Sequence, residues 1–426
     1  MGPVPSLWQA TAPAFASGMA GPVEGHYDVA IIGGGFTGLS AALALAKGGA
    51  RVALLEAGAV IGAASGRNGG QCNSGTAHDF GALAAAHGVD KARRWYLAHC
   101  DAVDTVERLA REEGIACDFT RAGRAKLAAK PQHVPKLEAA YKLLSAEVDP
   151  NVSLVDAAGL AGEIHASEFH AALIQHTSAQ LHVGRFGIGL AHAAARAGAH
   201  IWERAAVTGL NREAGQYRVE TPRGTLSASQ ILVATGGASP QAPFGWFRRR
   251  IVTVGSFAIA TAPLSQALAD HLFPGRRNYV TSRIIGNYFR LTADNRLVFG
   301  GRARFALSNP ASDLKGADIL EKAMLRLFPD MAGVPIEHRW GGAIDLTQDR
   351  LPRAGEHEGL YYAMGYSGHG VQMATHMGQQ MARVMGGEPD ANPFADLPWP
   401  AIPGHLGKPW FLPFVGAYYR VMDVFQ

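Results

Sequence analysis

The sequence predicts an α/β protein in which a parallel-sheet domain, assembled from separated segments, is interleaved with an α+β domain. Three observations predict this class. Short apolar runs typical of strands buried on both faces occur at 28–32, 230–234 and 360–363. A strand, a helix and a second strand follow one another within 28–55, the unit of a parallel sheet. Between 251 and 302 the pattern changes to alternating, strand-rich sequence, which favours an antiparallel sheet in the second domain.

Composition excludes several classes of protein. The chain has 426 residues, 48% hydrophobic and 17% charged, enough to bury a large core and too apolar for a disordered chain. Its 39 Lys+Arg against 35 Asp+Glu leave a net charge of +4, and the densest basic run, 248–250, is too short for a nucleic-acid surface. No disulfide framework or metal site is expected, because Cys72, Cys100 and Cys117 form no CxxC pair. With no signal peptide or apolar run of membrane-spanning length, we expect a cytoplasmic protein.

The elements follow in order from the N-terminus. Residues 1–26 lack periodicity and are interpreted as an arm. We predict a strand at 28–32, a helix at 37–47, a strand at 51–55 and mostly helical structure over 79–166. In the second half we predict a helix at 187–197, strands at 200–203, 217–220 and 230–234, and a hairpin of 288–291 with 296–299. The last elements are a strand at 360–363 and a helix at 371–385, closed by Gly386 and Gly387.

These elements divide the chain into two interleaved domains with an arm and a tail. The parallel-sheet domain is assigned 27–80, 180–245 and 338–395, and the second domain 81–179 and 246–337. Residues 396–426 form a tail whose stretch 410–425 is aromatic and nearly uncharged. Two interpretations of this tail remain open: packing against the body, or a peripheral membrane or partner contact.

The turn between the first strand and the first helix carries a dinucleotide-binding pattern. Gly33 permits the tight turn, Gly35 lets the backbone approach a pyrophosphate, and Gly38 lets the helix close on the strand. The helix N-terminus then offers free N–H groups to the phosphates. Glu56, at the end of the second strand, can accept both hydroxyls of an adenosine ribose. The domain is therefore predicted to be Rossmann-like.

The loop after the second strand favours FAD over NAD. Residues 62–71 read GAASGRNGGQ, a long loop that NAD does not need. An extended flavin requires backbone along its pyrophosphate and ring, so we interpret this as an FAD-binding domain.

With these motifs the chain resembles the D-amino-acid-oxidase-like superfamily of FAD-dependent enzymes, which includes glycine and sarcosine oxidases. The resemblance rests on IIGGGFTGLSAALALA (31–46), LLEAG (54–58), ASGRNGGQ (64–71), VATGG (233–237), RLVFGGR (296–302), WGG (340–342) and GYSGHGV (365–371). Within the superfamily, the start SLWQATAP, the SGRNGGQ loop and the tail PWFLPFVGAYYR look most like the gamma-glutamylputrescine oxidases.

The resemblance implies where the cofactor lies. Residues 65–70 would wrap the pyrophosphate and ring edge, Val207 would contact the adenine from a strand, and the helix opening at 368–370 would face the pyrimidine side of the flavin. The full set implied for FAD is Gly33, Gly35, Phe36, Thr37, Gly38, Glu56, Ala57, Ser65, Gly66, Arg67, Asn68, Gly69, Gly70, Gln71, Val207, Thr235, Gly236, Gly342, Gly368, His369, Gly370 and Val371.

The implied reaction is oxidative deamination of an amine. A hydride passes from the α carbon to flavin N5, the imine hydrolyses, and O2 or another acceptor takes the electrons. Candidate substrate-facing residues are Tyr288, Arg290 and Arg302 in the predicted hairpin region. His369 has two open roles, bordering the substrate or hydrogen-bonding a neighbouring backbone group.

Several positions depart from the pattern of sarcosine oxidases. Val371 and Gln372 stand where an aromatic residue and a carboxylate-holding lysine are found, which argues against a small α-amino acid. Val298 stands at the place of the oxygen-activating lysine, which leaves the use of O2 open. Ile344 aligns with a covalent flavin attachment site, and Cys72 is the other candidate for attachment, so we expect non-covalent FAD.

The favoured hypothesis is an FAD-dependent oxidase of gamma-glutamylputrescine or a related amine. One alternative is an amino-acid dehydrogenase that passes electrons to a membrane carrier, with the tail as its docking surface. A second alternative is a non-catalytic flavin-binding protein.

Overall fold

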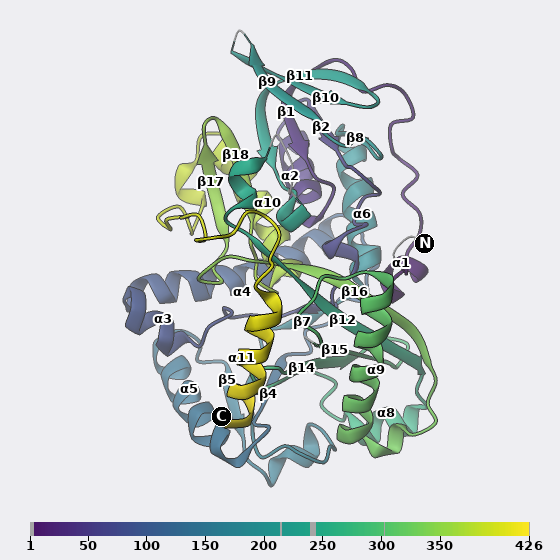
Figure 1. The fold of residues 1–426 in the computed structure, drawn as a ribbon, viewed down its shortest axis with the longest axis vertical. Coiled ribbons are helices and arrows are strands. Elements are labelled where there is room, and N and C mark those ends of the chain that lie inside the picture. The colour runs from purple at the N-terminus through teal and green to yellow at the C-terminus, as the bar shows by residue number, and fades with distance from the viewer. Residues whose placement is uncertain (1–3, 214, 239–243, 302, 426) are drawn as a thin grey trace.

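The computed structural model describes residues 4–213, 215–238, 244–301 and 303–425. Two eight-stranded sheets dominate it and lie end to end along the long axis (Figure 1). Each sheet takes strands from separated parts of the chain. The α/β class and the interleaving of an antiparallel sheet are therefore confirmed.

The first sheet is parallel at its centre, with the order β17-β18-β11-β1-β2-β8. β1 pairs in parallel with β11 and β2, and both of its faces are covered, which explains its continuous apolar sequence. β17 and the β9–β10 hairpin join antiparallel. The strands are β1 (His26–Ile32), β2 (Val52–Leu55), β8 (His200–Trp202), β9 (Gly209–Glu213), β10 (Gln216–Thr221), β11 (Gly224–Val233), β17 (Arg353–His357) and β18 (Leu360–Met364).

Three helices pack together beside this sheet: α2 (Phe36–Lys47), α6 (Val183–Arg196) and α10 (Gly370–Met385). Small residues let α2 and α10 approach closely, since a Cβ on Gly378 would lie 2.4 Å from the Thr37 carbonyl oxygen. The methionines Met373, Met377, Met381 and Met385 are buried in the core of this domain. The packing brings the N-termini of α2 and α10 to the same end of the sheet.

The second sheet has the order β16-β12-β15-β14-β13-β4-β6-β5 and is antiparallel except where β13 meets β4. The predicted hairpin is confirmed: β14 pairs with β15 around Asn295, which has a φ of 61°. The strands are β4 (Arg124–Leu127), β5 (Val152–Val155), β6 (Ala172–Gln175), β12 (Val252–Pro263), β13 (Asn278–Thr281), β14 (Asn287–Leu291), β15 (Arg296–Gly301) and β16 (Ile336–Leu346). A short ribbon of β3 (Gln71–Cys72) and β7 (Ala179–Gln180) lies apart from it.

One expectation about this region needs correction. The domain boundary expected at 338 falls inside β16, whose residues pair with β12 in the second sheet. The stretch 79–166 is mostly helical, as expected, and also contributes β4 and β5 to the same sheet. Its helices are α3 (Phe80–His87), α4 (Val89–Glu112) and α5 (Val134–Glu147), and α8 (Gln266–Leu272) and α9 (Pro310–Leu327) belong to the second domain.

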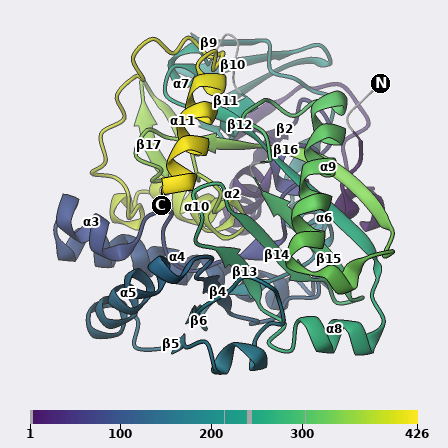
Figure 2. The same cartoon turned by 60° about the horizontal axis from the view of Figure 1, so that its bottom comes forward.

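The ends of the described chain carry short helices. The arm contains α1 (Leu7–Thr11), which packs on α6. α7 (Gly245–Arg248) precedes β12, and the tail ends in α11 (Leu412–Phe425), the yellow helix at the front of Figure 2. Hydrogen bonds of Asp423 with Lys130 and Ile284 hold α11 to the second domain. Among the described residues, no helix has both the length and the apolar character needed to cross a bilayer.

Candidate functional site

The turn from β1 into α2 has the geometry that its glycines predict. Gly33 has a φ of 115°, a conformation that favours glycine. A Cβ on Gly38 would lie only 1.9 Å from the Gly33 carbonyl oxygen, so glycine is required for the helix to close on the strand. Gly35 is the N-cap of α2 and makes no side-chain cap, and Phe36 and Thr37 begin the helix.

Glu56 stands at the end of β2 beside this turn. Its Oε2 accepts the Gly34 N–H at 2.6 Å and its Oε1 accepts the Gly58 N–H at 2.7 Å. The carboxylate is thereby fixed next to the glycine turn, half-buried, with the exposed Ala57 beside it. Val207 lies between β8 and β9 and not in a strand, which corrects the expected element.

The loop 64–71 runs across the N-terminus of α2. The Ser65 hydroxyl accepts the Phe36 N–H at 3.1 Å, and a Cβ on Gly35 would lie 2.9 Å from that Oγ. The Asn68 amide donates to the Ser65 carbonyl at 2.8 Å and its Oδ1 accepts the Gly70 N–H at 2.9 Å. The loop is therefore held to the N-terminus of α2 by its own polar side chains, with Gly66 buried and Gln71 at the start of β3.

The Arg67 side chain points away from the β1–α2 turn and into the protein interior. Its Nε donates to the Gly341 carbonyl at 2.6 Å, one amino group donates to the Val4 carbonyl, and the other lies 3.8 Å from Asp313. Burial lowers the pKa of Arg67 and the nearby Asp313 carboxylate opposes that shift. Its guanidinium thus ties the loop to the second domain, and a direct contact with a cofactor phosphate would require these bonds to change.

Arg290 is likewise an anchor. Its guanidinium donates to the carbonyls of Gly69, Leu181 and Leu291 at 2.8–3.1 Å, and it lies 5.1 Å from the Trp8 ring. Burial lowers the pKa of Arg290 to about 9. A guanidinium surrounded by carbonyls does not face a substrate, so Arg290 does not take the expected role. Arg302 lies outside the described residues.

Tyr288 lies at the junction of the loop and the second sheet. Its ring would meet a Cβ on Gly69 at 2.5 Å and one on Gly300 at 2.3 Å. Its hydroxyl is 3.5 Å from the Ser256 Oγ, and burial raises the pKa of Tyr288. The Tyr288 ring is therefore packed between Gly69 of the loop and Gly300 of β15.

The N-terminus of α10 lies beside the N-terminus of α2. Ser367 and Gly368 have left-handed φ values of 51° and 96°, and His369 is the N-cap. Tyr366 shares a 2.8 Å hydrogen bond with the Thr37 hydroxyl, and the Gln372 amide donates to the Asn73 carbonyl at 2.5 Å. The first turn of α10, with Gly370 and Val371, is thus held against α2 and against the segment that follows β3.

His369 is enclosed by other polar groups. Its ring lies 5.6 Å from that of His99, and its Nδ1 has no hydrogen-bond partner among the described residues. Burial, with further contributions from His99 and Arg124, lowers the pKa of His369 well below its usual value. The imidazole is therefore neutral at pH 7.

The remaining positions predicted for the cofactor lie on β16 and directly after β11. Gly342 lies against the loop, since its Cβ would be 3.0 Å from the Arg67 carbonyl oxygen. Thr235 and Gly236 follow β11, and a Cβ on Gly236 would be 3.2 Å from the Asp345 carboxylate. Asp345 also accepts the Gly365 N–H at 2.8 Å, and burial raises its pKa.

These segments fit an extended dinucleotide on the evidence of their own geometry. Glycines at 33, 35 and 38 leave backbone where side chains would clash, and two helix N-termini converge with a carboxylate at the end of β2. The family described as FAD dependent oxidoreductase (DAO) matches residues 28–384. The chain belongs to this family.

Relatives across the family agree with this assignment. The chain is 31% identical over 411 residues to probable oxidoreductase OrdL of Haemophilus influenzae, covering 94% of this chain and 93% of that protein. It is 31% identical over 403 residues to gamma-glutamylputrescine oxidoreductase of Escherichia coli, covering 93% and 92%. The structure of glycine oxidase from Geobacillus kaustophilus superposes with a TM-score of 0.72 at 22% identity, covering 89% of this chain and 98% of that one. The chain is an FAD-dependent oxidoreductase of the DAO family.

Sequence patterns missed three residues at this site: Trp8, His99 and Asp345. Trp8 lies in an arm without periodicity, and His99 is one residue of a long amphipathic helix. Asp345 follows the WGG motif closely, and that spacing was the one signal that could have found it.

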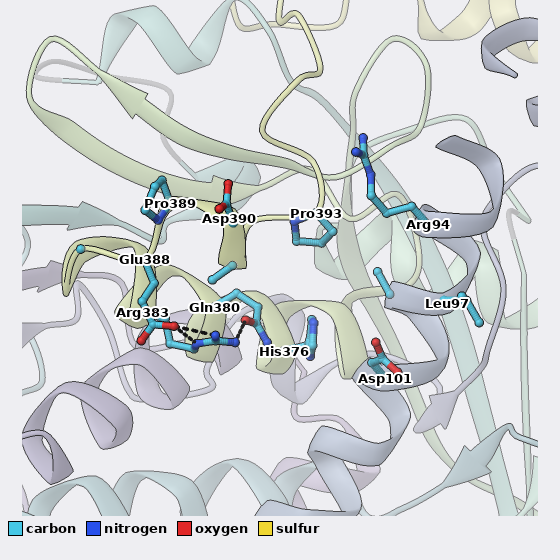
Figure 3. A pocket seen from close by; sticks show the side chains of 13 residues that line it. Arg94, Leu97, Asp101, His376, Gln380, Arg383, Glu388, Pro389, Asp390 and Pro393 are labelled. Atoms are coloured by element: carbon cyan, nitrogen blue, oxygen red, sulfur yellow. Dashed lines mark hydrogen bonds and ion pairs between the residues drawn. The ribbon is translucent and has the colours of Figure 1, made fainter. Parts of the chain in front are cut away.

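A separate pocket of about 640 Å³ lies between α4, the second half of α10 and the turn Pro389–Ala391 (Figure 3). His376 and Asp101 line it, and the Arg383–Glu388 ion pair crosses one side at 2.6 Å. None of the described residues assigned above to the cofactor lines this pocket.

Proposed function

We propose that this protein catalyses the FAD-dependent oxidation of an amine, with gamma-glutamylputrescine or a related amine as substrate. The observation that carries the proposal is the convergence of the α2 turn, the loop 64–71 and the first turn of α10 beneath Tyr288 of the second sheet. The E. coli relative named for gamma-glutamylputrescine supports the substrate class.

Three parts of this site would share the binding of FAD. Glu56 would accept the adenosine ribose hydroxyls, the α2 N-terminus and the loop at Ser65 would face the pyrophosphate, and the α10 N-terminus would face the flavin pyrimidine. Bound FAD supplies a two-electron acceptor for a hydride from the carbon that bears the nitrogen. The partial positive charge of the α10 N-terminus stabilises the negative charge that reduction brings.

Non-covalent binding is supported by the two positions considered for attachment. Cys72 is fully buried, and burial raises the pKa of its thiol, so little thiolate forms at neutral pH. Ile344 carries no nucleophile.

The substrate class is supported by Gln372. In sarcosine oxidases a lysine here holds the substrate carboxylate, whereas Gln372 is neutral, buried and bonded to the Asn73 carbonyl. A substrate recognised through an α-carboxylate would find no cation at this place. An amine of a polyamine conjugate needs none.

A second candidate function is favoured by one observation. Val298 stands at the position of the oxygen-activating lysine and is fully buried in the core between the two domains. Without that cation, reaction with O2 would be slow and an electron carrier would replace it. The protein would then be a dehydrogenase of an amine or amino acid.

Anaerobic flavin reduction distinguishes these functions. The holoenzyme is mixed without oxygen with gamma-glutamylputrescine, free polyamines, and D- and L-amino acids, and absorbance near the flavin maximum is followed. We expect bleaching by a gamma-glutamyl amine, then recovery with H2O2 formation in air. Bleaching without rapid recovery identifies the dehydrogenase. Failure of every compound to bleach the flavin overturns the catalytic proposal in favour of a flavin-binding protein.

A further inference from the structure

The C-terminal helix α11 is fixed to the second domain by its inner face. Tyr419 stacks on Phe305 with 5.9 Å between ring centroids, and a Cβ on Gly416 would lie 2.8 Å from the Phe305 side chain. The Asp423 carboxylate accepts the Ile284 N–H at 2.9 Å, and Lys130 donates to the Asp423 carbonyl at 2.7 Å. The orientation of the helix on the protein is therefore set along its length.

The outer face of α11 is apolar and aromatic. Phe414, Tyr418 and Val421 recur at helical spacing on this face, and Trp410 precedes them, with exposed fractions from 57% to 71%. With Leu406 these residues form what we call the docking face (406, 410, 414, 418 and 421). Every aromatic side chain among the exposed large hydrophobic residues of the described chain belongs to it.

The charge around the docking face is positive. Lys408 is exposed in this segment, and residues 397–419 contain no Asp or Glu. α7 brings Arg248 beside the same segment, since a Cβ on Gly407 would lie 2.4 Å from the Arg248 Cγ. The Ile402 N–H donates to the Arg249 carbonyl at 2.9 Å, which holds the Arg249 backbone there as well.

We infer that the docking face binds the surface of an anionic lipid bilayer. Trp, Tyr and Phe are the side chains enriched at the depth of the lipid headgroups, and an amphipathic helix lying in that plane buries such a face without spanning the membrane. The basic residues beside it complement anionic headgroups. A second copy of the chain is a poorer occupant, because a symmetric pairing of these faces would bring the basic segments together.

The contact would orient the second domain toward the bilayer. α11 is bonded to the connection between β13 and β14 at Ile284, and its Tyr419 hydroxyl is 3.4 Å from Arg350. Both attachments lie in segments adjoining the second sheet that carries Tyr288. The inference stands on these surface contacts alone and does not depend on the proposed amine oxidation.

Vesicle co-sedimentation of the holoenzyme tests this inference. Vesicles of equal parts phosphatidylcholine and phosphatidylglycerol should bind the protein, and vesicles of phosphatidylcholine alone should bind it more weakly. Binding to the anionic vesicles should fall as salt is raised. The variant with Phe414→Ser, Tyr418→Ser and Val421→Ser should bind at least tenfold more weakly (an order-of-magnitude figure), because it loses three exposed apolar side chains that the bilayer would bury.

A double variant with Val89→Ser and Leu97→Ser is the matched control, since both residues are exposed and apolar but lie on α4. It should bind vesicles as the parent does. Flavin absorbance and melting temperature confirm that each variant is folded. Absence of binding to anionic vesicles, or equal binding by the triple variant, overturns the inference. So does a dimer in light scattering that the triple variant breaks, which would make a second copy the occupant.

Discussion

At the scale of single residues, the site is notable for histidines that are held neutral. Burial lowers the pKa of His99 to about 4, and its Nδ1 donates to the Trp95 carbonyl at 2.8 Å. Farther along α10, beside the separate pocket, burial also lowers the pKa of His376 to about 4, with its Nδ1 2.8 Å from the Thr105 hydroxyl. His369 is neutral for the same reason. The positive potential at the N-terminus of α10 therefore comes from its backbone N–H groups and not from an imidazolium.

Stability should consequently fall in acid through these histidines. An unfolded imidazole has a pKa of about 6.5, so between pH 6.5 and 4 the unfolded chain binds a proton that folded His99 does not. The free energy of unfolding should therefore decrease as pH falls through this window. His99→Asn should remove on the order of 3 kcal/mol of that decrease, measured by urea unfolding at pH 7 and pH 4.5.

The exposed His87 provides the control, and His87→Asn should keep the parental pH dependence. An unchanged pH dependence in His99→Asn would show that His99 does not titrate in this way.

Residue roles were predictable where backbone geometry demands one residue type. Gly38 is such a case, because any side chain would collide with the Gly33 carbonyl. The role of Arg290 was not predictable, because its position in an alternating strand is compatible with either a ligand contact or a buried anchor. Only the carbonyls of Gly69 and Leu181, brought from distant parts of the chain, show that it is an anchor.

At the scale of elements, the short helix α1 and the Ser6 before it hold the glycine-rich loop (62–71) by hydrogen bonds, and we call this set of bonds the clasp. The Ser6 hydroxyl donates to the Gly66 carbonyl at 2.5 Å, and the Trp8 indole donates to the Asn68 carbonyl at 2.6 Å. The Gln9 amide donates to the Gly62 carbonyl at 2.9 Å. Three loop carbonyls are thus held by consecutive parts of the arm, which fixes the backbone that would face the cofactor.

Loosening this clasp should weaken FAD binding. Trp8→Phe keeps an aromatic ring but leaves the Asn68 carbonyl without its donor, a loss of about 1 kcal/mol. We expect the dissociation constant for FAD to rise roughly fivefold, measured by fluorescence titration of the apoprotein. Ala10→Ser, at an exposed position of α1, should leave affinity unchanged. Equal affinity in Trp8→Phe and the parent would refute the role of the clasp.

Elements with a strong local pattern were predictable and short ones were not. The strands at 28–32 and 360–363 are apolar apart from the exposed Asp28, because most of their residues are buried, and each corresponds to a strand of the first sheet. β4 and β5 have four residues each and lie among helices, so no local period shows them. Their place depends on pairing with β6, which sequence alone does not give.

At the scale of the whole molecule, the site depends on how the two sheets meet. Gly341 and Gly342 of β16, a strand of the second sheet, lie against the loop 64–71, and the Arg67 Nε donates to the Gly341 carbonyl. The Trp340 indole donates to the Arg67 carbonyl at 3.0 Å. Arg67 also lies 3.8 Å from Asp313 on α9, and both side chains are buried. The Arg67–Asp313 ion pair therefore joins the loop 64–71 to α9, which packs on the second sheet.

Removing the acid of this pair should cost both stability and cofactor. Asp313→Asn leaves the guanidinium of Arg67 buried without a countercharge while keeping an acceptor for the Ser308 hydroxyl. We expect the free energy of unfolding to fall by about 3 kcal/mol and FAD to be lost at lower urea concentration than in the parent. Asp318→Asn changes an exposed carboxylate on the same helix and should have no effect on either quantity. If Asp313→Asn unfolds and releases flavin at the parental urea concentrations, the two domains are joined by their apolar contacts and strand pairing alone, and the buried ion pair contributes nothing to holding the loop.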